Sequence, residues 1–241
     1  MLKTYIGFDC ATKTFAFSIV QIDIESFLEK KDSIRKKINA MLKLTNFYKN
    51  KPIISPDDLN KIDELIKSVN ALNDELQTFL IIVDGETVDL VPDRSDDNIS
   101  TVDRVRALSN YIDNRIMPSL NKVSNGDFIA IIEYQMSQNL RTRAIENALV
   151  AFFIKNEVII VGPALKNKVA VCEEGKYCYF TEKYSTSYCA NKAHTKFNFD
   201  YLEKIFGTNI RKVSPALHGH IADSFMQIIG YLQFGQSNAL F

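Results

Sequence analysis

The chain has 241 residues, of which 46% are hydrophobic and 24% are charged. This composition supplies enough apolar side chains for a sizeable core and excludes global disorder, and four cysteines are too few for a disulfide scaffold. No apolar run approaches the roughly 20 residues that a membrane-spanning helix needs. A strand pattern follows Met1 directly, so we expect no signal peptide. The composition therefore predicts an intracellular, cytoplasmic protein with reduced thiols and no membrane partner.

The net charge of zero conceals a separation of charges along the chain. Residues 51–100 hold 4 basic and 12 acidic side chains, a net charge of −8, so the remaining residues carry +8. A basic body beside an acidic block is compatible with binding a polyanion on one face. The acidic block is equally compatible with a solvated helical face, and the two interpretations do not conflict.

The first third of the chain predicts two strands followed by two helices. Residues 4–9 and 14–22 are dominated by aromatic and β-branched side chains, and the tight link between them predicts a hairpin. Between residues 24 and 80, apolar residues recur at spacings of three and four, and Ser55-Pro56-Asp57-Asp58 is typical of a helix start. We therefore expect two helices inserted into a sheet domain, within a largely helical, acidic insertion over 24–99.

The rest of the chain predicts strands that alternate with helices. Strands are expected at 80–83 and 87–91, as a hairpin turning at Asp84-Gly85, and at 128–132 and 158–161. Helices are expected at 103–117, 141–154, 199–206 and 215–234, and another hairpin is expected between 168–172 and 177–180. The leading strands suit an antiparallel meander and the later ones suit parallel pairing. The expected fold is a single α/β domain over 1–241, a mixed five-stranded sheet with helices on both faces.

Two carboxylates stand at the ends of expected strands. Asp9 ends the first strand, and Glu133 ends the apolar run 128–132, where a buried charge is costly unless it is paired or bound to a metal. Each also has an ordinary explanation, because Asp9 can cap the turn at Thr12 and Glu133 can be a solvated strand end. If the two strands are parallel neighbours, both carboxylates emerge at the carboxyl edge of the sheet, where ligand sites collect.

His220 and Asp223 lie three residues apart in the last expected helix, so both can face one site. A polar helix start containing His218 and His220 is the ordinary alternative. With Asp9 and Glu133 they form a set of hard oxygen ligands plus an imidazole, which suits two Mg²⁺ or Mn²⁺ ions. One ion would activate a water, and the other would stabilise the leaving oxygen of a phosphodiester.

Basic residues around the later strands could neutralise phosphates, although each taken singly is more often a surface charge. They are Arg141, Arg143, Lys166, Lys168, Lys192 and Lys196. Tyr134, Tyr184 and Tyr188 could stack on bases, with ordinary packing as the default. A zinc site could be imagined from Cys172, Cys178, Cys189 and His194. That set lacks the close Cys-x2-Cys pair of structural zinc sites, so packing is favoured.

Four segments in this order resemble the RuvC-type Holliday junction resolvases of the RNase H-like superfamily, and their poxvirus members most closely. The segments are Ile6-Gly7-Phe8-Asp9 followed by Lys13, Ile131-Ile132-Glu133-Tyr134-Gln135, Val161-Gly162-Pro163, and His220-Ile221-Ala222-Asp223-Ser224-Phe225. Lys192 and Lys196 resemble the basic stretch that enters the helix before the last one. The resemblance covers about 1–23 and 100–234 and leaves 24–99 outside.

The resemblance implies an RNase H-like fold, a homodimer and magnesium-dependent nicking of four-way DNA junctions. It implies metal ligands at Asp9, Glu133, His220 and Asp223, with Lys13 added to the basic residues that contact DNA. Many members of the family carry an acid where His220 stands, and an imidazole lowers the negative charge of the site.

Three classes of function compete to explain these residues. The first is an endodeoxyribonuclease that resolves four-way junctions during recombination or the processing of replication intermediates. The second is an RNase H-like nuclease acting on RNA–DNA hybrids or flaps. The third is an actin-like nucleotide-binding protein or a catalytically inactive DNA-binding module. The actin-like alternative needs a second glycine-rich phosphate loop, and the sequence, with nine glycines in all, contains none.

Overall fold

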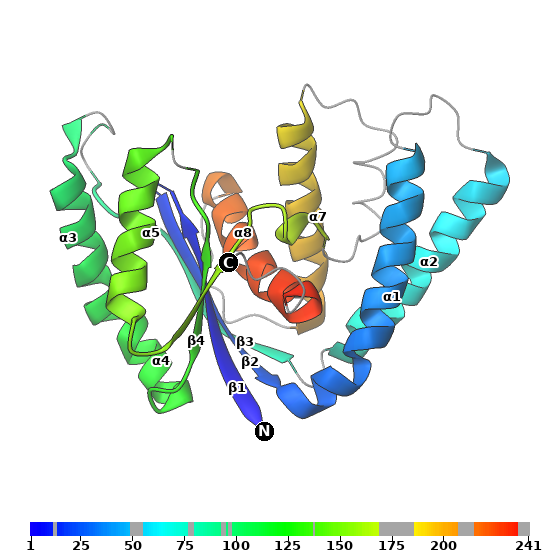
Figure 1. The fold of residues 1–241 in the computed structure, drawn as a ribbon, viewed down its shortest axis with the longest axis horizontal. Coiled ribbons are helices and arrows are strands. Elements are labelled where there is room, and N and C mark those ends of the chain that lie inside the picture. Colours follow the sequence, from blue (N-terminus) through cyan, green and yellow to red (C-terminus); the bar gives the residue numbers. More distant parts are fainter. Residues whose placement is uncertain are drawn as a thin grey trace.

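The centre of the molecule is a mixed sheet of five strands in the order β3-β2-β1-β4-β5 (Figure 1). The computed structural model describes residues 1–11, 14–48, 55–76, 80–92, 95, 98–136, 138–168, 186–206 and 215–235. The strands are β1 (Leu2–Cys10), β2 (Thr14–Asp23), β3 (Leu80–Asp89), β4 (Ile129–Glu133) and β5 (Glu157–Val161). The α/β class and the mixed five-stranded sheet predicted from the sequence are confirmed.

The strand pairing brings three strand ends to one edge of the sheet. β1 and β2 form an antiparallel hairpin, and β3 adds antiparallel to β2. On the other side of β1, β4 pairs in parallel with Phe8 opposite Ile132, and β5 pairs in parallel with β4. β1, β4 and β5 therefore all end at the same edge, which we call the carboxyl edge.

β3 is one continuous strand, so the hairpin predicted around Asp84-Gly85 is wrong. β2 pairs Ile19 with Asp84 and Val20 with Ile82, which leaves Val83 as an extra residue in a bulge. The guanidinium of Arg115 donates to both carboxylate oxygens of Asp84, at 2.7 and 2.8 Å. This tertiary contact holds Asp84 within the strand and overrides the local turn signal.

One face of the sheet is covered by the helices that lie between β3 and β5 in the sequence (Figure 1). They are α3 (Thr101–Tyr111), the π-helical turn η2 (Ile112–Ile116), α4 (Met117–Ser124) and α5 (Leu140–Phe153). Phe8 of β1 stacks on Phe15 and Phe153 in the core beneath them, with ring centroids 5.7 and 5.3 Å apart. The helix predicted over 103–117 continues past Pro118, because the wide π turn before it accommodates the proline ring and its missing N–H.

The opposite face is covered by α8 (Pro215–Phe234), against which α7 (Ser187–Phe206) packs (Figure 1). α8 approaches β1 so closely that a Cβ on Gly7 would lie 2.3 Å from the main-chain oxygen of Ser224. The hydroxyl of Ser224 also pairs with that of Ser18 on β2, at 2.8 Å. α7 begins at Ser187 rather than at the predicted Phe199.

The helices α1 (Ile24–Tyr48) and α2 (Pro56–Leu76) form a pair beyond α7 and α8 (Figure 1). Lys30 near the start of α1 pairs with Glu75 near the end of α2 at 2.9 Å, so the two helices run antiparallel. Phe27, Ile62 and Ile66 of this pair are buried in the core that β1 shares with α8. Because β3 belongs to the sheet, the helical part of the range 24–99 ends at Leu76.

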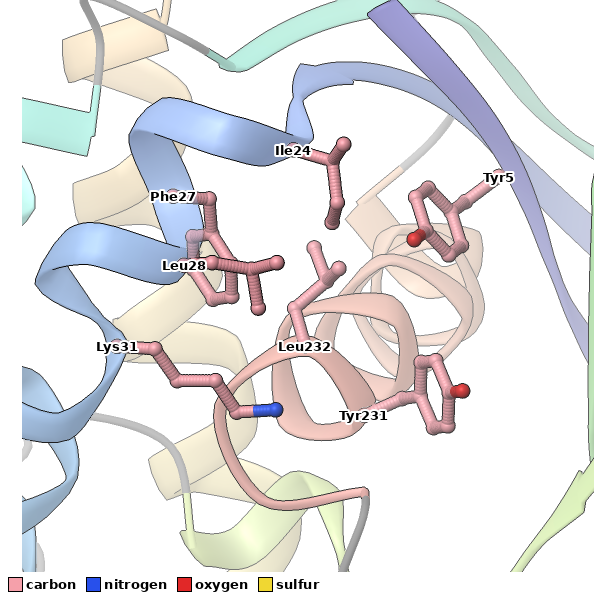
Figure 2. A pocket seen from close by; sticks show the side chains of 7 residues that line it. All are labelled: Tyr5, Ile24, Phe27, Leu28, Lys31, Tyr231 and Leu232. Atoms are coloured by element: carbon pink, nitrogen blue, oxygen red, sulfur yellow. The ribbon is translucent and has the colours of Figure 1, made fainter. Parts of the chain in front are cut away.

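A small pocket of about 50 Å³ lies where α1 meets β1 and α8 (Figure 2). Its lining residues are Tyr5, Ile24, Phe27, Leu28, Lys31, Tyr231 and Leu232. This volume is far below the roughly 300 Å³ at which small-molecule sites begin. Tyr5 lies towards the start of β1, whereas Asp9 lies at its carboxyl end. The pocket is therefore a packing gap at the joint of α1, away from the carboxyl edge.

After β5 the chain forms a turn, in which the N–H of Leu165 donates to the main-chain oxygen of Gly162 at 3.0 Å, and then the 3₁₀ turn η3 (Lys166–Lys168). The hairpin predicted over 168–180 falls almost entirely outside the described residues. Among the helices that the structure describes, none is long and apolar enough to cross a membrane.

Candidate active site

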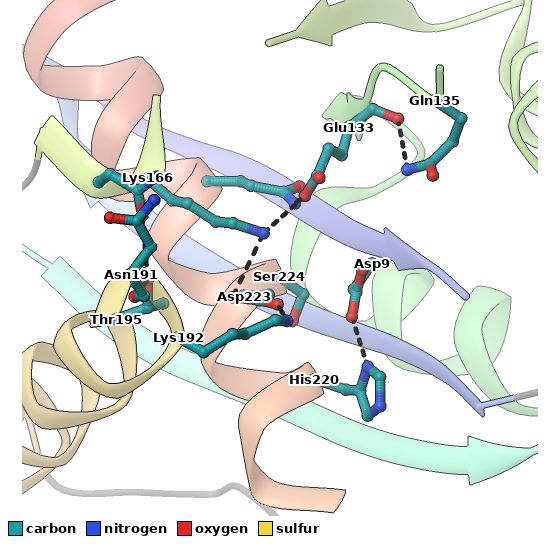
Figure 3. Close-up of polar contacts among 12 residues, drawn as sticks. Asp9, Glu133, Gln135, Lys166, Asn191, Lys192, Thr195, His220, Asp223 and Ser224 are labelled. Carbon is teal, nitrogen blue, oxygen red and sulfur yellow. Dashed lines mark hydrogen bonds and ion pairs between the residues drawn. The ribbon is translucent and has the colours of Figure 1, made fainter. Parts of the chain in front are cut away.

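Three buried carboxylates meet at the carboxyl edge of the sheet (Figure 3). Asp9 and Glu133 directly follow the paired residues Phe8 and Ile132, so they stand side by side at the ends of β1 and β4. Alternation along each strand points both side chains towards α8, which supplies Asp223. Asp9 and Glu133 are 9% exposed and Asp223 is 1% exposed. The sequence prediction that Asp9 and Glu133 emerge at one edge is confirmed.

His220 lies one helical turn before Asp223 and is held by two hydrogen bonds. Its Nδ1 lies 2.6 Å from Oδ2 of Asp9, and its Nε2 lies 3.0 Å from Oγ1 of Thr14. The Nδ1–H can donate to the carboxylate, and Nε2 and the Thr14 hydroxyl can pair in either direction. Thr14, the first residue of β2, is a member of the site that sequence analysis missed.

Two lysines predicted to contact phosphates lie among the carboxylates instead (Figure 3). Nζ of Lys166, in η3, lies 2.9 Å from Oε2 of Glu133 and 3.3 Å from Oδ1 of Asp223. Nζ of Lys192, in α7, forms an ion pair with Oδ2 of Asp223. Both oxygens of Asp223 therefore face an ammonium group. Sequence analysis predicted both lysines as phosphate contacts and did not pair them with the carboxylates.

Glutamine and glutamate side chains fix the segment around Glu133. Gln227, fully buried one turn after Asp223 on α8, donates through Nε2 to Oε2 of Glu133. Gln135 donates through Nε2 to the main-chain oxygen of Glu133 at 3.2 Å. From the opposite face, Glu146 of α5 accepts the main-chain N–H of Gln135 at 2.8 Å. The i, i+4 spacing from Asp223 could have indicated Gln227, whereas no local pattern marks Glu146.

The charges of the cluster shift one another's pKa values. Burial alone would raise the pKa of Asp9, but the hydrogen bond from His220 and the charge of Lys166 hold it below its ordinary value. Burial raises the pKa of Glu133, and the attraction of Lys166 does not offset it. Burial alone would lower the pKa of Lys166 and of Lys192, but the neighbouring carboxylates, Asp223 first among them, raise both. Both lysines are therefore protonated at neutral pH.

The donor set suits a hard divalent cation in its chemistry, because Mg²⁺ and Mn²⁺ prefer carboxylate oxygens. In the present arrangement, no three His, Cys, Asp or Glu side chains among the described residues are placed to hold a metal ion. Lys166, Lys192 and His220 occupy carboxylate oxygens instead. A cation would have to bind through the oxygens that these groups leave open.

Three other predicted DNA contacts lie on α5 and α7. Arg141 and Lys196 are exposed on α5 and α7. Arg143 lies with its guanidinium carbon 5.5 Å from the ring centroid of Tyr134 and donates to the hydroxyl of Tyr134 at 3.4 Å. Tyr134 directly follows Glu133 and is 37% exposed. Arg143 therefore lies against the segment that leaves the carboxyl edge after Glu133.

Several predicted residues cannot be placed. Lys13 and Tyr184 lie outside the described residues, as do the side chains of Lys168, Tyr188 and His218. Of the suggested zinc ligands, Cys172 and Cys178 also lie outside them. Cys189 lies on α7, where its Sγ accepts from the hydroxyl of Thr186 at 3.3 Å. His194 is fully buried, with its Nε2 3.0 Å from Nδ2 of Asn198, and burial lowers its pKa to about 3.

No family model, no curated protein and no solved structure matches the chain.

Proposed function

We propose that this protein is a metal-dependent, structure-specific endodeoxyribonuclease that resolves four-way DNA junctions by symmetric nicking. The observation that carries the proposal is the meeting of Asp9, Glu133 and Asp223 with His220 at one sheet edge. Three acids from separate segments, each about a tenth exposed or less, are costly to bury without a function.

The topology supports an RNase H-like fold. An antiparallel meander of β1, β2 and β3 is followed by two parallel strands, and helices cover both faces. The resemblance in sequence calls for this arrangement. It also calls for acids at the ends of the first and fourth strands and in the last helix, where Asp9, Glu133 and Asp223 lie.

The carboxylates would hold Mg²⁺, or Mn²⁺ in its place. When bound, the cation would supply the Lewis acidity that hydrolysis of a phosphodiester needs. Asp9 would accept from Nδ1–H of His220, which would direct the lone pair of Nε2 towards the Thr14 hydroxyl. A water that donates to the Thr14 hydroxyl would pass its proton through that hydroxyl to Nε2 as it attacks the phosphate.

The surrounding basic residues would bind the DNA backbone. Arg141 and Arg143 lie on α5, and Lys196 lies on α7 one turn after Lys192, and these side chains would neutralise phosphates without reading base edges. Such contacts suit an enzyme that recognises branch shape. Two symmetric nicks in one junction require two sites, so the proposed active form is a homodimer.

The experiment that tests the proposal compares three labelled substrates, with Mg²⁺ and with EDTA. The substrates are a four-way junction, a linear duplex of the same sequence and an RNA–DNA hybrid. We expect paired nicks in the junction with Mg²⁺, little cleavage of the duplex or hybrid, and none with EDTA. Preferential cutting of the hybrid would favour the second class of function, and junction binding without cleavage would favour the inactive DNA-binding module.

Variants of the strand-end acids test the site itself. Asp9→Asn and Glu133→Gln should each abolish cleavage while junction binding persists, because phosphate contacts lie elsewhere. Asp127→Asn is the matched control, since Asp127 is an exposed acid just before the opposite end of β4. If either site variant cuts at the wild-type rate, the site is assigned wrongly.

A further inference from the structure

The chain that leaves β4 after Glu133 is held by a carboxylate from the face of the sheet opposite to α8. The N–H of Tyr134 continues the parallel ladder and donates to the main-chain oxygen of Val161 at 2.8 Å. Oε2 of Glu146, on α5, accepts the next N–H, that of Gln135, also at 2.8 Å. Because the pairing between β1 and β4 has already ended at this point, Glu146 supplies an acceptor where a neighbouring strand no longer does.

Glu146 occupies a position at which a carboxylate needs an explanation. It follows the core residue Ile145 on α5 and is only 3% exposed. A buried carboxylate is costly unless it is paired or hydrogen-bonded. The hydrogen bond that the structure gives to its carboxylate comes from the Gln135 N–H. An apolar side chain would suit this core, so the contact with Gln135 is the reason we assign to the acid.

We propose that Glu146 is a positioning residue of the active site, which holds Glu133 at the carboxyl edge through the main-chain N–H of Gln135. This inference rests on the proposed nuclease function. Gln227 of α8 contacts the Glu133 carboxylate from one face of the sheet, and Glu146 fixes the main chain two residues later from the other face. The end of β4 is thereby held from both faces, beside Asp9 at the end of β1.

A second contact joins α5 to the same segment. Arg143 lies three residues before Glu146, so both share one face of α5. Arg143 donates to the hydroxyl of Tyr134 at 3.4 Å, and α5 therefore contacts both residues that directly follow Glu133. The contact of Arg143 is at the surface, where a phosphate can compete for the guanidinium, whereas that of Glu146 is buried. Loss of Glu146 should therefore change the chemical step and leave DNA binding intact.

The test measures kcat and KM of the full chain on a labelled four-way junction with Mg²⁺. Glu146→Met removes the acceptor and keeps the length of the side chain. We expect kcat to fall roughly 10- to 100-fold with KM unchanged, because misplacing a reacting group by about 1 Å can cost that much. Glu146→Gln keeps an oxygen that can accept the Gln135 N–H and should rescue most of the rate.

Thr142→Val is the matched control on the same helix. Thr142 is a buried polar residue of α5, and its hydroxyl donates to the main-chain oxygen of Asn139 at 3.1 Å. Its loss should leave kcat near the wild-type value. Hydrogen exchange of the Gln135 N–H, followed by nuclear magnetic resonance, reports the contact independently of activity. We expect slow exchange in the wild type and in Glu146→Gln, and fast exchange in Glu146→Met.

The outcomes separate this inference from the proposed function. A folded Glu146→Met with the wild-type kcat, or equal losses of kcat in Glu146→Met and Glu146→Gln, would overturn the positioning role and leave the nuclease proposal standing. Fast exchange of the Gln135 N–H in an active wild type would do the same. If circular dichroism shows that Glu146→Met is unfolded, Glu146→Asp replaces it, because it withdraws the acceptor by one methylene group and should also lower kcat. A wild type that cleaves no DNA substrate would overturn both proposals.

Discussion

At the scale of single residues, the imidazole of His220 is oriented by partners from two strands. Asp9 holds its Nδ1 from β1, and Thr14 meets its Nε2 from β2. Thr14→Val removes the hydroxyl and keeps the shape of the side chain. We expect the maximal cleavage rate to fall about tenfold, the effect of losing one hydrogen bond of about 1.4 kcal/mol, with the Michaelis constant unchanged. Steady-state kinetics on a four-way junction measure this effect.

Thr4→Val is the control for that variant. Thr4 is a buried threonine of β1 at the end of the strand far from the site, where its hydroxyl accepts from Gln21 at 3.4 Å. Its replacement should leave the cleavage rate near the wild-type value. Equal losses in the two variants would show that the hydroxyl of Thr14 has no special role.

The ionised carboxylate of Glu133 is expected to lower the free energy of unfolding at neutral pH. Burial raises the pKa of its carboxyl above the ordinary value, so the folded state favours the protonated form. The stability that a buried neutral carboxyl contributes is present below the unfolded pKa of about 4.3 and is lost as pH rises through the folded pKa. Glu133→Gln mimics the protonated form, and Lys166 keeps Asp223 as a partner.

Glu133→Gln should therefore raise the unfolding temperature at pH 8 by roughly 2–4 °C, the shift that about 1 kcal/mol gives in a chain of this size. The gain should be largely lost at pH 4, where most of the wild-type carboxyl is protonated in both states. Thermal melts followed by circular dichroism at the two pH values check this. A lower unfolding temperature at pH 8 would mean that the ion pair with Lys166 outweighs the cost of burial.

The four acid and imidazole residues were found from the sequence because strand ends and the i, i+3 helix spacing indicate them locally. The partners Lys166, Lys192 and Thr14 were not assigned to them, because their contacts join segments far apart in the chain. Spacing determines which residues share a face only within one element. The contact between Lys166 and Glu133 depends on where η3 lies relative to β4, and no sequence pattern specifies that placement.

At the scale of elements, the contact between β1 and α8 sets the geometry of the site. Gly7 lies two residues before Asp9 and directly beneath Ser224 of α8. In Gly7→Ala the added methyl group would meet main chain, which cannot move aside as the end of a side chain can. We expect a loss of about 1–3 kcal/mol in the free energy of unfolding and a larger loss of cleavage than of junction binding. Urea denaturation and binding assays measure the two effects.

Gly219→Ala is the matched control for Gly7→Ala. Gly219 lies in α8 next to His220, and a Cβ there would meet nothing within 4 Å. Because alanine favours a helix over glycine by about 1 kcal/mol, this variant should be as stable as the wild type or more so. A destabilised Gly219→Ala would mean that this part of α8 tolerates no change. The loss in Gly7→Ala could then not be assigned to the contact between Gly7 and Ser224.

The existence of most elements followed from hydrophobic periodicity, and the errors have identifiable tertiary causes. The Asp84-Gly85 turn signal was wrong because Arg115 and Ser119 hold Asp84 within β3. The helix at 103–117 was too short because the π turn before Pro118 lets it continue. These features arise from contacts between elements or from helix irregularities, neither of which periodicity reports.

At the scale of the whole molecule, the chain leaves the sheet after β2, forms α1 and α2, and re-enters the sheet in β3 beside the point where it left. Ile22 of β2 pairs with Leu80 of β3, so the strands on either side of the helical pair are already adjacent. Replacing 24–78 by an Asn-Gly turn should leave a folded sheet, because a two-residue hairpin turn spans paired strands. The unfolding temperature should fall, since Phe27, Ile62 and Ile66 leave the core.

Sedimentation and circular dichroism of this deletion variant test two expectations. A folded variant would show that the helical pair is an insertion, and a shift from dimer to monomer would assign dimerisation to it. The control is the full-length protein with Leu59→Asp. This change alters an exposed apolar position of α2 and leaves the core intact, so it shows the effect of a more polar surface on solubility alone. An unfolded deletion would instead make α1 and α2 part of the minimal fold.

The close contact of α8 with β1 also has a consequence for protein synthesis. The ribosome makes Asp9 more than two hundred residues before it makes His220 and Asp223. A nascent chain without α8 can pair its early strands, but it lacks the helix that packs against Gly7 and supplies Asp223 to the cluster of acids. Products of premature termination before α8 would therefore combine an exposed apolar sheet face with an incomplete site. The proposed nuclease would therefore gain its complete site only once α8 has been made.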